Sequence, residues 1–293
     1  MTLADGIWQQ IFSFENYGEL LALVRNSLIA GAALGLVGGL AGVFVIMRDL
    51  PFAVHGISEL SFAGASAALL MGVDIVAGSI AGSLVAAGAI GILGARARDR
   101  NSAIGILMPF GLGLGVLFLA LYKGRAANKF GLLTGQIVAV DTPQTNWLLG
   151  TSALVLVVLA VIWRPLAFAS ADPDVAEARG VPVRGLSFAF MLVLGLTVAL
   201  SVQVVGALLV LTLVVTPAAA AARVTASPVL LPLLSVAFAV LSIEGGILLA
   251  LGSSIPISPY VTTISFTVYV VCRLVGGHRS RRRGARRSAP HPA

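Results

Sequence analysis

Charged residues and cysteine are scarce in this chain of 293 residues. Only 11% of the residues are charged and 58% are hydrophobic, whereas a soluble domain carries about 25% charged residues. The single cysteine, Cys272, excludes a disulfide framework and a Cys-x-x-Cys site. Apolar runs long enough to cross about 30 Å of hydrocarbon recur along the whole chain. The composition therefore excludes an ordinary soluble domain and predicts an all-α polytopic membrane protein.

The chain also lacks the groups that nucleotide hydrolysis and nucleophilic catalysis need. A P-loop requires Gly-x-x-x-x-Gly-Lys followed by Ser or Thr, and neither lysine, Lys123 or Lys129, has that context. Two of the three histidines, His278 and His291, lie in a polar C-terminal tail. We therefore predict that the chain is not an enzyme, and that any ATP hydrolysis comes from a partner chain.

Apolar segments divide the sequence into an N-terminal segment, a membrane domain and a tail. Residues 1–26 resemble an amphipathic interfacial segment or a loosely ordered terminus, and residues 277–293 a basic, disordered tail. The membrane domain, 27–276, contains candidate spans at 27–47, 53–72, 75–95, 103–122, 146–163, 186–202, 204–222, 229–251 and 260–276. The stretch 186–222 has no charged break, so we expect eight or nine transmembrane helices.

Arginines predict the orientation of these spans. They concentrate in the loops after the first, third, fifth and seventh spans and in the tail. Cationic loops stay in the cytoplasm, so we expect a multi-pass protein of a bacterial inner membrane with a cytoplasmic C-terminus. Nine spans would then place the N-terminus outside, and eight spans would place it inside. The arginine-rich tail favours either contact with anionic membrane lipids or a solvated, disordered segment, and nucleic-acid binding is the weaker interpretation.

Few ionisable residues fall inside the predicted spans. His55 and Glu59 are one helical turn apart and share a face of the second span, with Glu59 about 12 Å along the axis from Pro51. Imidazole and carboxylate are both ligands of first-row metals, so we predict a transient metal site there. A structural hydrogen-bonded pair and a proton relay are the alternatives. Glu244 is a second intramembrane acid. We expect it either to line the same metal pathway, to pair with an arginine or to face water.

Other residues in the spans suggest packing and a kink. Glycines at 31, 35 and 39, and at 111, 113 and 115, allow close approach of helices or, less readily, gating. Pro217 lies inside the seventh span and predicts a kink there.

The polar stretch 171–183 predicts a short capped helix. Asp172 can cap it with Pro173 at its first position, and Gly180 can end it. Such a helix is either a docking element for a partner or an ordinary loop helix. Its remaining candidate contact residues are Asp174, Ala176 and Glu177.

Three stretches together resemble the permease subunits of bacterial zinc/manganese/iron importers of the ATP-binding-cassette (ABC) class. They are the segment from Asp172 to Pro182, the segment from Gln203 through Thr216-Pro217 to Ala221, and the segment from Gly245 to Pro259. The resemblance implies a type II ABC importer-like permease that forms a homodimer and works with cytoplasmic ATPase subunits and an extracytoplasmic metal-binding protein. It also implies that the segment Asp172–Gly180 is the coupling helix that docks to the ATPase.

The family usually carries Asp-x-x-x-His in its second span. Here His55 occupies the place of the aspartate and Glu59 that of the histidine, so the ligand types are exchanged while the spacing is kept. In the family's later Asp-x-Pro-x-Gly motif, Ser254 replaces the acid and Ser258 the glycine.

Together these features predict a permease for a divalent transition metal, with zinc first and manganese second, carried as substrate without a permanently bound cofactor. A siderophore or cobalamin permease of similar architecture, a proton-coupled or secondary carrier that works alone, and a membrane anchor are the competing functions.

Overall fold

The computed structural model describes residues 21, 24–93, 97–124, 131–132, 142–251 and 256–287, and helices dominate these ranges. The predicted N-terminal segment therefore lies almost entirely outside the described residues. Eight helices are long and apolar enough to cross a membrane, which confirms the predicted all-α membrane fold. They are α3 (Arg25–Met47), α4 (Pro51–Met71), α5 (Ile75–Leu93), α6 (Ala97–Leu121), α8 (Thr142–Ala171), α10 (Val183–Val205), α13 (Leu230–Leu251) and α14 (Ile257–Arg287).

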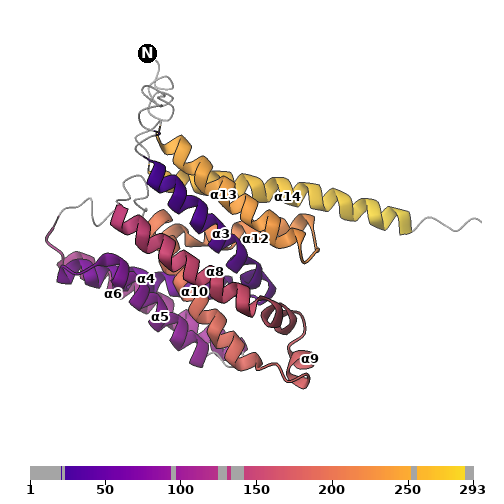
Figure 1. Cartoon of the computed structure of the whole chain (residues 1–293), viewed down its shortest axis with the longest axis horizontal. Helices are drawn as coiled ribbons and strands as arrows, with labels where there is room; N and C mark the ends of the chain where they lie inside the picture. The colour runs from indigo at the N-terminus through magenta and orange to yellow at the C-terminus, as the bar shows by residue number, and fades with distance from the viewer. Residues whose placement is uncertain are drawn as a thin grey trace, which may run out of the picture.

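The long helices form two groups around a shared centre. On one side α4 packs against both α5 and α6, and on the other side α12 (Thr216–Val224), α13 and α14 pack against one another. Helices α3 and α10 lie between the groups, and α8 packs against both of them. Helix α10 contacts α3, α4, α5 and α8 (Figure 1). A core that includes Phe44, Phe62 and Phe190 is fully buried along this centre.

A broken segment follows α10 and returns across the bundle. Gly206 adopts a positive φ of 80° and ends α10, after which come a 3-10 turn (η2, Ala207–Leu209), α11 (Val210–Val214) and α12. The Ser258 hydroxyl donates to the Val205 carbonyl at one end, and the Arg223 carbonyl lies against Gly276 at the other. The segment thus runs alongside α14 as an interrupted apolar element that is shorter than the eight long helices.

The interruption lies where the proline predicts it. Helix α11 ends at Val214, and α12 begins at Thr216 with Pro217 in its first turn. A proline there lacks the N–H that would continue the preceding helix. The predicted kink is confirmed.

Two glycine stripes pack helices closely, as expected. A Cβ atom on Gly35 would lie 2.9 Å from the Cα of Val240, and one on Gly39 would lie 2.6 Å from the Cα of Val236. Both distances are shorter than a real side chain tolerates, so α3 and α13 meet backbone to backbone. Gly111 approaches α4 in the same manner, whereas nothing lies within 4 Å of the corresponding position on Gly113.

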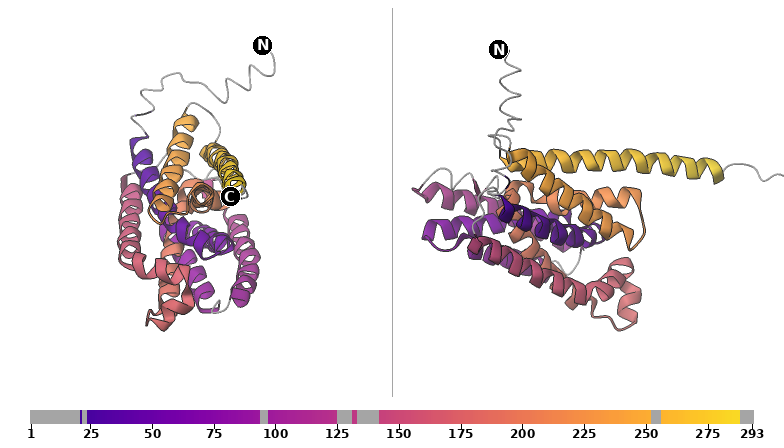
Figure 2. Two further views of the ribbon diagram at one scale, coloured as in Figure 1. Left: turned by 90° about the vertical axis from the view of Figure 1, so that its right-hand side faces the viewer. Right: turned by 45° about the horizontal axis from the view of Figure 1, so that its top comes forward.

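Helix α14 continues to Arg287, beyond the membrane domain and into the region whose composition predicts a disordered tail. Figure 2 shows it extending past the ends of its neighbours. Arginine favours helix, and an existing helix is extended more easily than a new one is nucleated. Residues 288–293 lie outside the described part of the chain.

Candidate functional site

Helix α4 positions the two predicted metal ligands. It begins at Pro51 and ends at Met71, and the following Gly72, with a φ of 71°, caps it in the left-handed conformation. This regular helix aligns His55 and Glu59 four residues apart, and Nε2 of His55 lies 3.7 Å from Oε1 of Glu59. The histidine side chain is 29% exposed and the glutamate side chain only 5%. One ligand is therefore accessible while the other is buried behind it.

The carboxylate of Glu59 is incompletely paired. Its Oε2 atom is buried and has no hydrogen-bond partner. The 3.7 Å separation of Oε1 from the imidazole is longer than a hydrogen bond. A buried carboxylate oxygen without a partner is costly. A bound cation or a proton would satisfy that oxygen.

The separation of the two side chains is compatible with a shared metal ion. Two ligands at about 2.1 Å from a tetrahedral ion are about 3.4 Å apart, and the two atoms here are 3.7 Å apart. A shift of a few tenths of an ångström would let both contact one ion. Two ligands leave the remaining coordination positions to water or other groups, which suits a cargo that must be released.

Packing contacts fix the backbone of this helix turn. A Cβ on Gly111 of α6 would lie 3.0 Å from the Glu59 carbonyl carbon, so the helices touch directly behind the acid. The Ser58 hydroxyl donates to the His55 carbonyl at 2.8 Å. The Ser61 hydroxyl bonds to the Ser79 hydroxyl at 2.8 Å and joins α4 to α5. These serines therefore have structural hydrogen bonds, and His55 and Glu59 remain the candidate metal ligands.

Glu244 lies apart from this pair. It is on α13, where its Oε1 atom is buried without a hydrogen-bond partner, 2.9 Å from the position that a Cβ on Gly31 would occupy. Helix α13 packs against α3, α12 and α14, whereas α4 packs against α5, α6 and α10. Within the described ranges no three His, Cys, Asp or Glu residues form a metal-binding group. The structure thus brings two of the three predicted ligands together, and Glu244 has no arginine partner there.

Gln203 is a polar residue of the membrane domain that the sequence analysis did not single out, because its amide is not ionisable. Both polar atoms of its side chain are buried without hydrogen-bond partners, in the last turn of α10 before the break at Gly206. The sequence signal was present, since an amide stands there within a long apolar run. An unsatisfied amide beside a helix break marks a second polar position inside the bundle.

The predicted short helix is present as α9 (Pro173–Ala178). The Asp172 side chain accepts a hydrogen bond from the Val175 amide at 3.0 Å and caps it. Ala176 is fully buried against the bundle, while Asp174 and Glu177 are exposed. Gly180 has a φ of 81° and ends the segment. Helix α9 lies at an edge of the bundle (Figure 1), and all its residues except Ala176 are exposed.

Comparisons with known proteins identify the family of the whole membrane domain. The ABC 3 transport family matches residues 21–276. The manganese transport system membrane protein MntC of Halalkalibacterium halodurans is 27% identical, covering 85% of each chain. The manganese import system permease protein ScaB of Streptococcus parasanguinis is 31% identical over 68% of this chain and 71% of its own. The high-affinity zinc uptake system membrane protein ZnuB of Haemophilus influenzae is 25% identical over 86% and 97%.

Solved structures give the same result. PsaBC from Streptococcus pneumoniae, in complex with a Fab, aligns with a TM-score of 0.77 at 25% identity, covering 87% of this chain and 94% of the other. An inward-facing putative metal-chelate type ABC transporter shares the fold, with a TM-score of 0.67 at 19% identity over 92% and 89% of the two chains. The predicted resemblance to ABC permeases is confirmed, and the chain is a multi-pass membrane protein that belongs to the ABC 3 transport family.

Proposed function

We propose that this chain is the membrane permease of an ATP-driven importer whose cargo is a divalent transition metal, manganese or zinc. Two copies would form the pathway, cytoplasmic ATPase subunits would dock on α9, and an extracytoplasmic binding protein would deliver the metal. The observation that carries this proposal is the buried, incompletely paired carboxylate of Glu59 beside the accessible imidazole of His55.

The transport mechanism that we propose is alternating access. Metal released by the binding protein would contact both His55 and Glu59, and Glu59 would supply the compensating negative charge. Nucleotide-driven movement of the ATPase would act through α9 on α8 and α10, which flank it. Since α10 also packs against α4, a movement at α9 can reach the metal ligands through a single helix.

Relatives named for manganese and for zinc both support a metal cargo. The pair offers one nitrogen and one oxygen ligand, a set that either ion accepts. We propose Glu244 as a later contact on the same pathway, reached in another conformation or from the second copy, because its buried oxygen also lacks a partner.

The orientation is part of the proposal. The C-terminal end of α14, the α8–α9 junction and the end of α3 lie at one end of the molecule (Figures 1 and 2). Arginines gather near these ends, and from the positive-inside rule we propose that these ends face the cytoplasm.

Uptake of radioactive manganese and zinc by cells that lack the native chain tests the function. Cells complemented with the wild type should accumulate one of the two ions, and competition between them should identify the cargo. His55→Ala and Glu59→Gln should abolish accumulation at equal protein levels, while His278→Ala in the tail should not. Full uptake by a His55→Ala, Glu59→Gln double variant would refute the assignment. Accumulation in liposomes without any ATPase would instead support a carrier that works alone.

A further inference from the structure

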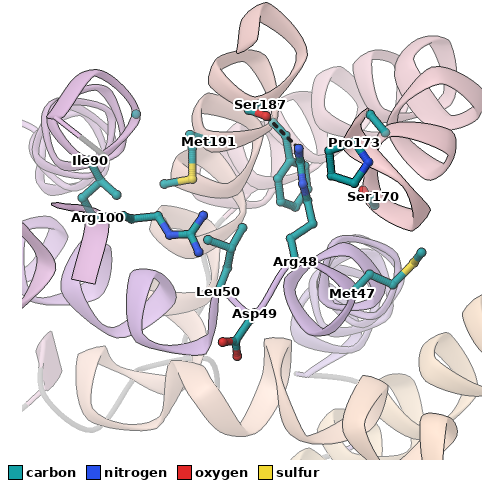
Figure 3. A pocket seen from close by; sticks show the side chains of 13 residues that line it. Met47, Arg48, Asp49, Leu50, Ile90, Arg100, Ser170, Pro173, Ser187 and Met191 are labelled. Carbon is teal, nitrogen blue, oxygen red and sulfur yellow. Dashed lines mark hydrogen bonds between the residues drawn. The ribbon is translucent and has the colours of Figure 1, made fainter. Parts of the chain in front are cut away.

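A cavity lies at the α9 end of the molecule, and its lining does not include the predicted metal ligands. It has a volume of about 380 Å³ and lies between the α3–α4 connection, the end of α5, the first turns of α6, the α8–α9 junction and the start of α10. Figure 3 shows two arginine side chains, Arg48 and Arg100, entering it from different sides. We call it the two-arginine pocket, lined among others by Arg48, Arg100, Ser170, Pro173, Ser187 and Phe190.

Among the side chains that the structure describes, neither guanidinium group has an acidic partner. Arg48 donates from Nη2 to the Ser187 hydroxyl at 2.7 Å, and its Cζ lies 5.9 Å from the centre of the Phe190 ring. The Nε atom of Arg100 is buried and has no hydrogen-bond partner. Asp49 also lines the pocket, yet its carboxylate points away from both arginines and forms no ion pair with them in the described structure (Figure 3).

Electrostatics in this pocket favour an added anion. Burial lowers the pKa of Arg48 from its usual value, and the positive charge of Arg100 lowers it further. Two cations that enter one cavity and repel each other are stabilised when a negative group lies between them. Guanidinium groups recognise phosphate oxygens through paired hydrogen bonds, and the unpartnered Nε of Arg100 is one donor for such a bond.

Apolar side chains near the pocket indicate the source of the anion. Ile92 and Leu93 at the end of α5 are 70% and 59% exposed, and Met47 and Phe188 are also exposed. Phe188 packs against Gly91, which lines the pocket, and Met47 lines it as well. Basic pockets between membrane helices that adjoin apolar surface are typical binding places for lipid head groups. An acidic protein surface would not account for these exposed apolar residues.

We propose that the two-arginine pocket binds a phosphate group, supplied by the head group of an anionic phospholipid, with free phosphate as the other source of the same chemistry. The bound group would bridge Arg48 after α3 to Arg100 on α6, beside Pro173 at the base of α9. Under the function proposed above, it would hold together the helix ends that carry the movement of the ATPase. Binding itself requires neither metal transport nor a particular orientation.

Native mass spectrometry of the purified full-length protein in detergent micelles that contain phosphatidylglycerol or phosphatidylcholine tests the proposal. The wild type should retain phosphatidylglycerol selectively, and an Arg48→Gln, Arg100→Gln double variant should bind it roughly thirtyfold more weakly, the effect of two arginine contacts. Arg164→Gln, which removes an exposed arginine on α8, should behave as the wild type. Millimolar inorganic phosphate that displaces the lipid, or stabilises the wild type alone, would support free phosphate as the source.

Equal lipid and phosphate binding by the wild type and the double variant would overturn the proposal. The proposal would also be overturned if the double variant kept its lipid occupancy but no longer co-purified with the ATPase. The arginines would then bind a protein surface and not a lipid. If the double variant fails to fold, the thermal stability of the wild type decides: selective stabilisation by phosphatidylglycerol or phosphate supports the pocket, and stabilisation by neither refutes it. Metal uptake can fail without changing any of these results.

Discussion

Glu59 on α4 and Glu244 on α13 are both acids within the membrane domain, yet their surroundings differ. Each has a buried oxygen without a hydrogen-bond partner. Glu59 has an imidazole 3.7 Å away, whereas Glu244 lies against Gly31 on the closely packed α3–α13 interface. An unpaired acid alone does not define a metal site, because binding needs further ligands beside it. We therefore propose that α4 carries the principal metal contact.

The largest expected effect separates the two acids directly. Glu59→Gln keeps the shape of the side chain and removes its charge, so we expect metal uptake to fall about a hundredfold or more, since loss of a group in only the outer shell of a metal site already costs 10- to 100-fold. Glu244→Gln should lower uptake by about tenfold or less. Initial rates of isotope uptake at matched membrane levels measure both. A larger loss from Glu244→Gln than from Glu59→Gln would reverse the assignment.

The interface between α3 and α13, against which Glu244 lies, should not tolerate larger side chains. Gly39→Val would force a side chain into the backbone of Val236, and overpacking of this kind typically costs about 1–3 kcal/mol. Gly113→Val is the matched control, because no atom lies within 4 Å of that position. Thermal unfolding in detergent compares the two variants. Equal stability of both would show that the α3–α13 contact is looser than described.

A smaller effect is expected at α9. Asp172→Ala removes the hydrogen bond to the Val175 amide, and loss of such a cap costs about 1 kcal/mol. We expect weaker co-purification of the ATPase and slower uptake, with metal binding unchanged. Asp174→Asn, which changes an exposed acid of the same helix and leaves the cap intact, is the control. A stronger effect of Asp174→Asn would mean that its charge, rather than the fold of α9, makes the contact.

The smallest expected effect concerns the order of the ligands. A His55→Asp, Glu59→His double variant would restore the order typical of this family while keeping the spacing of one turn. Because it retains one imidazole and one carboxylate, we expect uptake to persist within about tenfold of the wild type, with a changed preference between manganese and zinc. Competition between the two ions measures that preference. Complete loss of uptake would show that the position of each ligand type is fixed by its surroundings.

Sequence patterns predicted the membrane helices and α9 well, for reasons that are local. A span is recognisable from its length and apolarity, the kink from Pro217, and α9 from its cap at Asp172 and its end at Gly180. The spacing of His55 and Glu59 also predicted their proximity, because one regular helix carries both.

Contacts between distant helices were less accessible from the sequence. The glycine repeat indicated close packing of α3 but did not identify α13 as its neighbour. Likewise, Arg48 and Arg100 appeared only as charges that orient the chain, and their convergence in one cavity depends on how α3, α6 and α10 pack. The separation of Glu244 from α4 has the same origin, since hydrophobic patterns do not specify which helices meet.

Metal binding to the purified permease tests the central claim most directly. Equilibrium dialysis with radioactive manganese or zinc should show saturable binding to the wild type and to Glu244→Gln. The account predicts that His55→Ala and Glu59→Gln each remove this binding while the protein keeps its thermal stability. Undiminished binding in a His55→Ala, Glu59→Gln double variant would contradict it, because the metal would then be held elsewhere.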